Sequence, residues 1–117
     1  MADAGIFMSW DRPAPGHGTK ALELYKRLAT YLTALHAEGR IASWEPVLLS
    51  AHGGELGGFL IIRGKRENLN LIRESREFRE IMVRGSSAML KFRVVRAHFG
   101  QEAQELMNVY QRVELEK

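Results

Sequence analysis

The sequence predicts an α+β fold in which two helices cover one side of a four-stranded antiparallel sheet. Strand-like and helix-like hydrophobic patterns follow one another in the order β-α-β-β-α-β, and a further helix pattern comes last. Glycine and proline concentrate between these patterns, where turns are needed. With right-handed crossovers, this order places the first and third strands at the centre of the sheet and the other two at its edges. We therefore expect one ferredoxin-like domain over residues 1–117.

The segment Gly57–Gly64 predicts a central strand of this sheet. It holds four large apolar residues in a row, with glycine at both ends. Successive side chains of a strand point to opposite faces, so a run without a polar residue indicates burial on both faces. The pattern leaves open which alternate pair faces the helices, Phe59 with Ile61 or Leu60 with Ile62.

The first half of the chain supplies two strands and a helix. Ile6–Trp10 has a strand pattern, and the loop Asp11–Gly18 that follows contains two prolines and two glycines. Ala21–Glu38 is predicted to be a helix, because leucines recur along it at three- and four-residue spacings. Ile41–Leu49 is the second strand. Pro46 within it favours a sheet edge, since proline donates no ladder hydrogen bond.

The second half repeats this arrangement. A turn at Ala51–Glu55 joins the second strand to the central one. Glu67–Val83 is predicted to be one helix that ends before Gly85–Ser87. Its expected apolar stripe consists of Leu71, Phe78, Ile81 and Met82. Leu90–His98 is the fourth strand, whose three basic residues suit an exposed edge, and Glu102–Val113 is a terminal helix.

The composition limits the classes of function. The chain has no cysteine, which excludes disulfides, thiolate nucleophiles and cysteine-based metal sites. No pair of histidines or carboxylates has the spacing of metal ligands, and no glycine-rich segment opens a helix as nucleotide-binding loops do. We therefore expect neither a bound metal nor a cofactor. No stretch reaches the roughly 20 apolar residues of a membrane span, so we expect a soluble, cytoplasmic protein.

Positive charge concentrates in residues 63–98, which hold ten lysines and arginines against four glutamates. Such a segment can attract an anion or nucleic acid. Two pairs at i,i+4 spacing, Arg73 with Glu77 and Arg76 with Glu80, instead favour a solvated helix face. No basic strand with interleaved aromatic residues accompanies the charge, so nucleic-acid binding is the less favoured interpretation.

The predicted sheet has an apolar surface that its two crossover helices leave bare. Both helices lie on one face, yet Phe59 and Ile61 alternate with Leu60 and Ile62 and so give both faces apolar residues. Burying a side chain of this size contributes roughly 1.5–3 kcal/mol, so we expect the second face to be covered. The candidate covers are the terminal helix and the sheet of a second copy of the chain.

The element order, the chain length and the segment from Gly39-Arg40-Ile41 through Gly64 resemble the dimeric α+β barrel superfamily. That group includes the antibiotic-biosynthesis-monooxygenase-like and YCII-like families, and the resemblance covers residues 5–100. It implies a homodimer whose two sheets pack face to face, with a pocket between sheet and helices in each protomer. As an activity it implies cofactor-independent oxygenation.

The chain departs from the functional motifs of these families. Arg76-Glu77-Phe78 stands where YCII-like proteins have an Asp-Pro-Phe segment. The Asn–Trp–His set of the haem-degrading members has no counterpart that aligns. The resemblance therefore implies a fold and a homodimer more directly than it implies a reaction.

The candidate ligand-binding residues are two tryptophans and three histidines, namely Trp10, Trp44, His17, His52 and His98. Indoles on strands can line an apolar pocket for a flat, aromatic or quinone-like ligand, although core or interface packing is more usual. Histidine offers acid–base chemistry near neutral pH.

Three loops, over residues 11–18, 51–55 and 85–88, are expected at one end of the sheet. They would bring His17 and His52 near Asp11, Ser86 and Ser87, whose turn offers backbone N–H groups to an anion. The alternative is that these are ordinary polar residues of exposed loops. His98 closes the fourth strand, where it either faces the interior or simply ends the strand.

The leading hypothesis is a homodimer that binds a small apolar or aromatic molecule, with oxygenation as the reaction that the resemblance implies. A non-catalytic module for self-association or protein interaction is the alternative. An anion or nucleic-acid binder acting through residues 63–98 is the second alternative. Catalysis stays open at this stage, and no catalytic residue is assigned.

Overall fold

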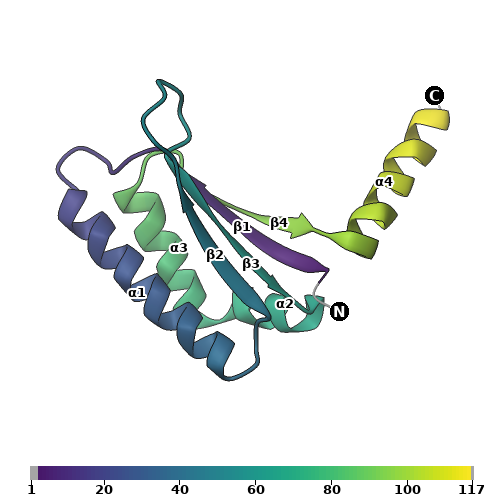
Figure 1. Cartoon of the computed structure of the whole chain (residues 1–117), viewed down its shortest axis with the longest axis horizontal. Helices are drawn as coiled ribbons and strands as arrows, with labels where there is room; N and C mark the ends of the chain where they lie inside the picture. The colour runs from purple at the N-terminus through teal and green to yellow at the C-terminus, as the bar shows by residue number, and fades with distance from the viewer. Residues whose placement is uncertain (1–2, 117) are drawn as a thin grey trace.

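The computed structural model describes residues 3–116 and has the predicted order of elements, with one helix divided in two (Figure 1). The strands are β1 (Ala4–Trp10), β2 (Ser43–Leu48), β3 (Gly58–Gly64) and β4 (Arg93–His98). The helices are α1 (Gly18–Ala37), α2 (Arg66–Glu74), α3 (Arg76–Ala88) and α4 (Gly100–Leu115). The α+β class and the ferredoxin-like order are confirmed.

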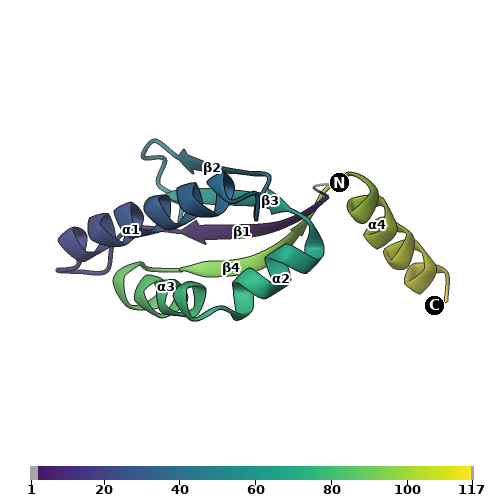
Figure 2. The same cartoon turned by 90° about the horizontal axis from the view of Figure 1, so that it is seen from below.

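The sheet has the strand order β2-β3-β1-β4, and all neighbouring strands are antiparallel. The prediction that the first and third strands are central is therefore correct. Pro46 lies on the edge strand β2, which has a neighbour on one side only, and there its missing N–H is tolerated. Helices α1, α2 and α3 lie on one face of this sheet (Figure 2).

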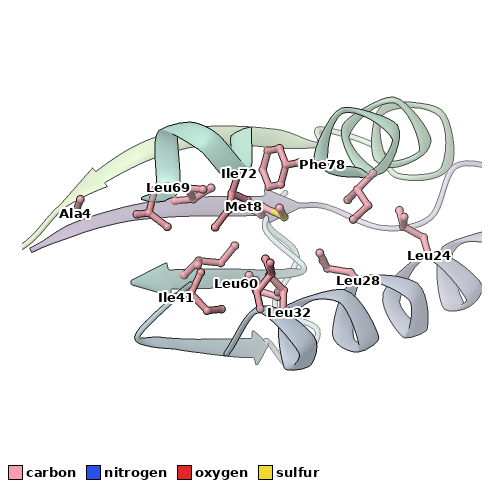
Figure 3. Packing of buried hydrophobic residues seen from close by; sticks show 14 residues of the cluster. Ala4, Met8, Leu24, Leu28, Leu32, Ile41, Leu60, Leu69, Ile72 and Phe78 are labelled. Carbon is pink, nitrogen blue, oxygen red and sulfur yellow. The ribbon is translucent and has the colours of Figure 1, made fainter. Parts of the chain in front are cut away.

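The core lies between the sheet and these helices (Figure 3). Even-numbered residues of the central strands point into it. The most completely buried members include Ile6, Met8, Leu32, Leu60, Ile62 and Phe78. The pair Leu60 and Ile62 therefore faces the helices, while Phe59 and Ile61 face the opposite side and are only half-buried.

The predicted helix Glu67–Val83 is two helices, because the chain breaks at Ser75. Ser75 has an extended backbone (ψ 153°), and its Oγ accepts a hydrogen bond from the Phe78 N–H at 3.3 Å. The same hydroxyl donates to the Ile72 carbonyl at 2.6 Å. Ser75 thus ends α2 and caps α3. The break also turns Leu71 outward, where it is 63% exposed, so its assignment to the buried stripe is wrong.

The turn expected at Gly85–Ser87 lies inside α3 instead. Gly85 is buried, and a Cβ on it would lie 2.4 Å from the Phe92 ring, so glycine permits close packing there and does not end the helix. Lys91, with a φ of 57°, turns the chain after α3. β4 consequently begins at Arg93, later than predicted.

α4 does not cover the sheet. It begins just after β4 and projects away from the layers of sheet and helices (Figures 1 and 2). None of its described residues is buried, and Met107, Tyr110 and Val113 are all more than half exposed. Of the two covers considered for the second face of the sheet, the chain's own terminal helix does not serve.

Candidate functional site

The sheet face opposite the helices, which we call the open face, carries an apolar patch. Its apolar residues are Phe7, Val47, Phe59, Ile61 and Val95. The rings of Phe7 and Phe59 meet at the centre with their centroids 5.5 Å apart. Val95 on the edge strand is 51% exposed. A contiguous apolar surface of this kind is typical of an interaction site.

Arg63 and Phe99 bound the open face at the end where α4 starts. The guanidinium carbon of Arg63 lies 3.8 Å from the centroid of the Phe99 ring. The ring packs directly against the backbone of Gly5, where a Cβ would lie only 2.4 Å from it. This end of the open face is therefore an aromatic wall with a cation on its outer side.

A recess of about 480 Å³ lies at the other end of the sheet, and we call it the loop-end recess. Trp10, Asp11, His52 and Met89 are among its lining residues. Hydrogen bonds between the backbones of residues 11–14 and 88–90 hold two of its walls together. The expected convergence of the loops is present, although Ser86 and Ser87 belong to α3.

His52 uses both ring nitrogens within its own loop. Its Nδ1 accepts a hydrogen bond from the Gly54 N–H at 3.1 Å, so Nε2 carries the proton that it donates to the Leu56 carbonyl at 2.6 Å. These bonds shape the loop and leave no free lone pair for abstracting a proton. His17 is similarly local, since its Nδ1 lies 3.1 Å from the Pro15 carbonyl oxygen.

The two tryptophans lie on the helix side of the sheet and not on the open face. Trp44 packs against the core from the edge strand β2, in register with Ile62. Trp10 also packs against the core, and its ring lies over Gly58. The structure brings Trp10 and His52 together at the loop-end recess, and places Trp44 and His98 elsewhere.

A smaller cavity of about 130 Å³ lies where β1, β4, α2 and α4 meet, and we call it the arginine cavity. Its polar lining residues are Arg66, Asn70, Arg73, Arg96, His98 and Glu102. Arg66 donates to Glu102 Oε2 from Nε at 3.0 Å and from Nη2 at 2.7 Å. The other carboxylate oxygen of Glu102 is hydrogen-bonded to Nδ1 of His98.

Two of the three guanidinium groups in this cavity lack a partner among the described residues. Neither Arg73 nor Arg96 forms an ion pair there, and Nη1 of Arg73 is buried without a hydrogen-bond acceptor. A buried donor left unsatisfied costs about 1–3 kcal/mol, and more when the group is charged. The arrangement therefore has positive charge in excess and a donor that calls for an acceptor.

Glu102 is the single carboxylate among the described lining residues of the arginine cavity, and its side chain is only 11% exposed. Burial by itself raises the pKa of this carboxyl group. The hydrogen bonds and positive charge of Arg66 and His98 outweigh that effect, so the pKa lies below its usual range. Glu102 is consequently ionised at neutral pH and offsets one of the positive charges.

The arginine cavity was missed in the sequence because the charge of residues 63–98 favoured a solvated helix face. That interpretation holds for Arg76 and Glu80, which pair at 3.4 Å. It is wrong for Arg73 and Glu77, because the break at Ser75 puts them on different helices. A signal was present in the spacing. Arg66, Asn70 and Arg73 recur at four and three residues, alongside the buried positions of α2, and so share the inward side of that helix.

Metal sites and membrane spans are two further features that the described part of the chain lacks. Within residues 3–116, no group of three or more His, Asp or Glu side chains is placed to hold a metal ion. Within the same residues, no helix combines the length and the apolar character that crossing a membrane requires.

The fold is similar to that of solved proteins whose function is unknown. A dimeric ferredoxin-like protein from Bacteroides fragilis matches over 85% of this chain and 98% of its own, with a TM-score of 0.61 and 12% identity. A dimeric ferredoxin-like protein from Thermobifida fusca matches over 85% and 93%, with a TM-score of 0.64 and 7% identity. A conserved protein from Methanosarcina mazei matches over 85% and 95%, with a TM-score of 0.58 and 13% identity.

No protein-family model matches the sequence, and no curated protein is similar to it. At identities this low, the solved neighbours establish the ferredoxin-like fold alone. Two of them are described as dimers, which is the assembly that the bare open face calls for.

Proposed function

We propose that the protein acts as a homodimer in which two open faces pack against each other and enclose a small apolar or aromatic molecule. The observation that carries this proposal is the bare apolar patch around Phe7, Phe59 and Ile61. Sheets that pack face to face lie about 10 Å apart, and side chains from both fill the space between them. A flat ligand fits such a layer between aromatic rings.

Three observations support the open face as the place of assembly. No helix of residues 3–116 packs on it, and α4 projects away from the layers of sheet and helices (Figure 1). α4 also has exposed apolar residues of its own, including Met107 and Tyr110, which a second copy can cover. Two solved neighbours of this fold are described as dimeric.

The open face is also the better place for the ligand. The resemblance implies a pocket between sheet and helices, but core side chains fill that space (Figure 3). The loop-end recess, with Trp10 and His52, is the second place for a ligand. Trp44, His17 and His98 line neither of these two places.

The oligomeric state tests the first half of the proposal. Size-exclusion chromatography with light scattering should find a dimer at micromolar concentration. Ile61→Lys should give a folded monomer, because a charge in a dry interface is costly whereas the monomer leaves it in water. Leu71→Lys is the matched control, since Leu71 is 63% exposed on α2, and it should remain a dimer. A wild-type monomer would refute the proposal.

Ligand binding tests the second half. A naphthoquinone should raise the melting temperature of the wild type and of Leu71→Lys, and should have no effect on Ile61→Lys. If Trp10→Ala abolishes the shift while the dimer persists, the loop-end recess is the binding place instead. Oxygen uptake with the corresponding dihydroquinone then separates an oxygenase from a binding protein, and the proposal commits to binding.

A further inference from the structure

We propose that the arginine cavity is a binding site for a phosphate-sized oxyanion. It is independent of the open face, since it lies on the helix side of the sheet at the junction of β1, β4, α2 and α4. Its polar lining brings together arginines from two elements that are 23 residues or more apart, α2 and β4.

The charge of the cavity defines the class of ligand. Three guanidinium groups face one carboxylate, that of Glu102, so two positive charges remain uncompensated among the described lining residues. A phosphoryl dianion matches that excess. The planar fork of arginine suits phosphate oxygens, because two N–H groups can donate to them in parallel.

The free donors of the cavity define where the ligand binds. Arg66 is already occupied by Glu102, whereas the buried Nη1 of Arg73 has no acceptor among the described residues. Arg96 is in register with Ile6, whose side chain is in the core, so it projects from β4 on the same face. Asn70 adds an amide between Arg66 and Arg73 on α2. An anion between Arg73 and Arg96 satisfies the unpaired donor.

The size of the cavity limits the ligand to a small group. A volume of about 130 Å³ is well below the roughly 300–1,000 Å³ of pockets that hold drug-sized molecules. It suits free phosphate or the phosphoryl end of a phosphate monoester, with the remainder of the ester outside the cavity.

Glu102 acts as an internal competitor for this site. Its carboxylate holds Arg66 and lowers the net positive charge that an incoming anion meets. Removing that charge should therefore strengthen anion binding, whereas removing an arginine should weaken it. These opposite directions distinguish a specific site from a general effect of surface charge.

Isothermal titration calorimetry at matched ionic strength tests the site with inorganic phosphate, glycerol 3-phosphate and acetate. We expect one saturable phosphate site per chain and much weaker acetate binding. Equal affinity for the two phosphates identifies the phosphoryl group as the determinant, and tighter binding of inorganic phosphate identifies the free ion as the ligand.

Variants assign the binding to the arginine cavity. Arg73→Gln and Arg96→Gln should each weaken phosphate binding roughly tenfold or more, and Glu102→Gln should strengthen it. Arg84→Gln on α3 is the matched control, because Arg84 does not line this cavity, and it should bind as the wild type does. Arg96 is exposed, so its substitution leaves the core intact. The proposal is overturned if neither phosphate binds, or if Arg73→Gln and Arg96→Gln behave like Arg84→Gln. Binding should persist in Ile61→Lys whatever its oligomeric state.

Discussion

The guanidinium group of Arg63 stacks on the ring of Phe99, 3.8 Å from its centroid, and so joins β3 to the residue that precedes α4. The ring reaches this position because Gly5 presents no side chain beneath it. Its backbone is held as well, since the Phe99 N–H donates to the Asp3 carbonyl at 2.8 Å. The direction in which α4 leaves the sheet therefore depends on three residues from different parts of the chain.

Gly5→Ala should displace the Phe99 ring, because the new Cβ would lie 2.4 Å from it. We expect a loss of about 1 kcal/mol of unfolding free energy, which includes the cation–π contribution of roughly 0.5–1 kcal/mol. Amide exchange in the first turn of α4 should become faster.

Arg63→Met supplies the second corner of a double-mutant cycle for this contact. The double variant should lose less stability than the two single losses added together, since Gly5→Ala already removes the stacking. Strict additivity in urea unfolding would contradict the role assigned to Gly5.

Gly57→Ala should be among the most destabilising single changes in the chain. A Cβ at residue 57 would lie 1.7 Å from the Asp11 carbonyl oxygen, which is backbone and cannot rotate away. Gly57 also links two strands, because its N–H donates to Trp10 and its carbonyl accepts from Leu49. We expect a loss of several kcal/mol in chemical denaturation.

Gly18→Ala is the control for that experiment. Gly18 begins α1, a Cβ on it would have no neighbour within 4 Å, and its φ is not left-handed. Alanine there should be neutral or should stabilise by up to about 1 kcal/mol. Equal effects at residues 18 and 57 would show that backbone crowding at Gly57 is not the cause.

The sequence predicts the sheet well because its central strands are continuous apolar runs. The pattern of residues 57–64 and the proline at position 46 suffice to rank strands as central or edge, and the strand order agrees. Which face of β3 meets the helices depends on register with β1, and a run that is apolar on both sides does not encode that.

The second helix region is predicted less well, because its break depends on one hydroxyl. Ser75 lies among charged residues that are all good helix formers, and only its hydrogen bonds to Ile72 and Phe78 show that it separates two helices. The arginine cavity depends on that break and on the position of α4. Its residues are far apart in sequence, so their meeting is a tertiary property.

Substitutions in α2 test the corrected buried face. Ile72→Ala should cost about 2–5 kcal/mol of unfolding free energy, since Ile72 is 1% exposed in the core. Leu71→Ala should change stability by less than about 0.5 kcal/mol, because Leu71 already lies in water. The reverse order in urea unfolding would restore the single-helix prediction.

Ser75→Ala should destabilise the protein by about 1 kcal/mol through loss of the cap on α3. The hydroxyl also lies 3.3 Å from that of Tyr31 on α1, so its removal loosens the contact between the helices. Ser86→Ala is the matched control, because Ser86 is exposed within α3, where alanine is the better helix former. Similar melting temperatures for the two variants would contradict the capping role.

The stability that Glu102 provides should depend on pH in a defined direction. Its pKa is lowered in the folded protein, because Arg66 and His98 favour the ionised form more strongly than burial disfavours it. A group of this kind contributes fully above its unfolded pKa of about 4.3, and its contribution fades as the pH falls through the lower folded value. Wild type and Glu102→Gln should therefore differ most near neutral pH and converge in acid.

Urea midpoints of both proteins between about pH 7 and pH 3 measure this convergence. Glu105→Gln is the matched control, because Glu105 is exposed on the same helix and does not line the arginine cavity. It should differ little from the wild type at neutral pH. A gap between wild type and Glu102→Gln that stays constant or widens in acid would show that the carboxylate gains nothing from Arg66 and His98. In that case Glu102 would be a bystander in the arginine cavity, and its substitution would not strengthen phosphate binding.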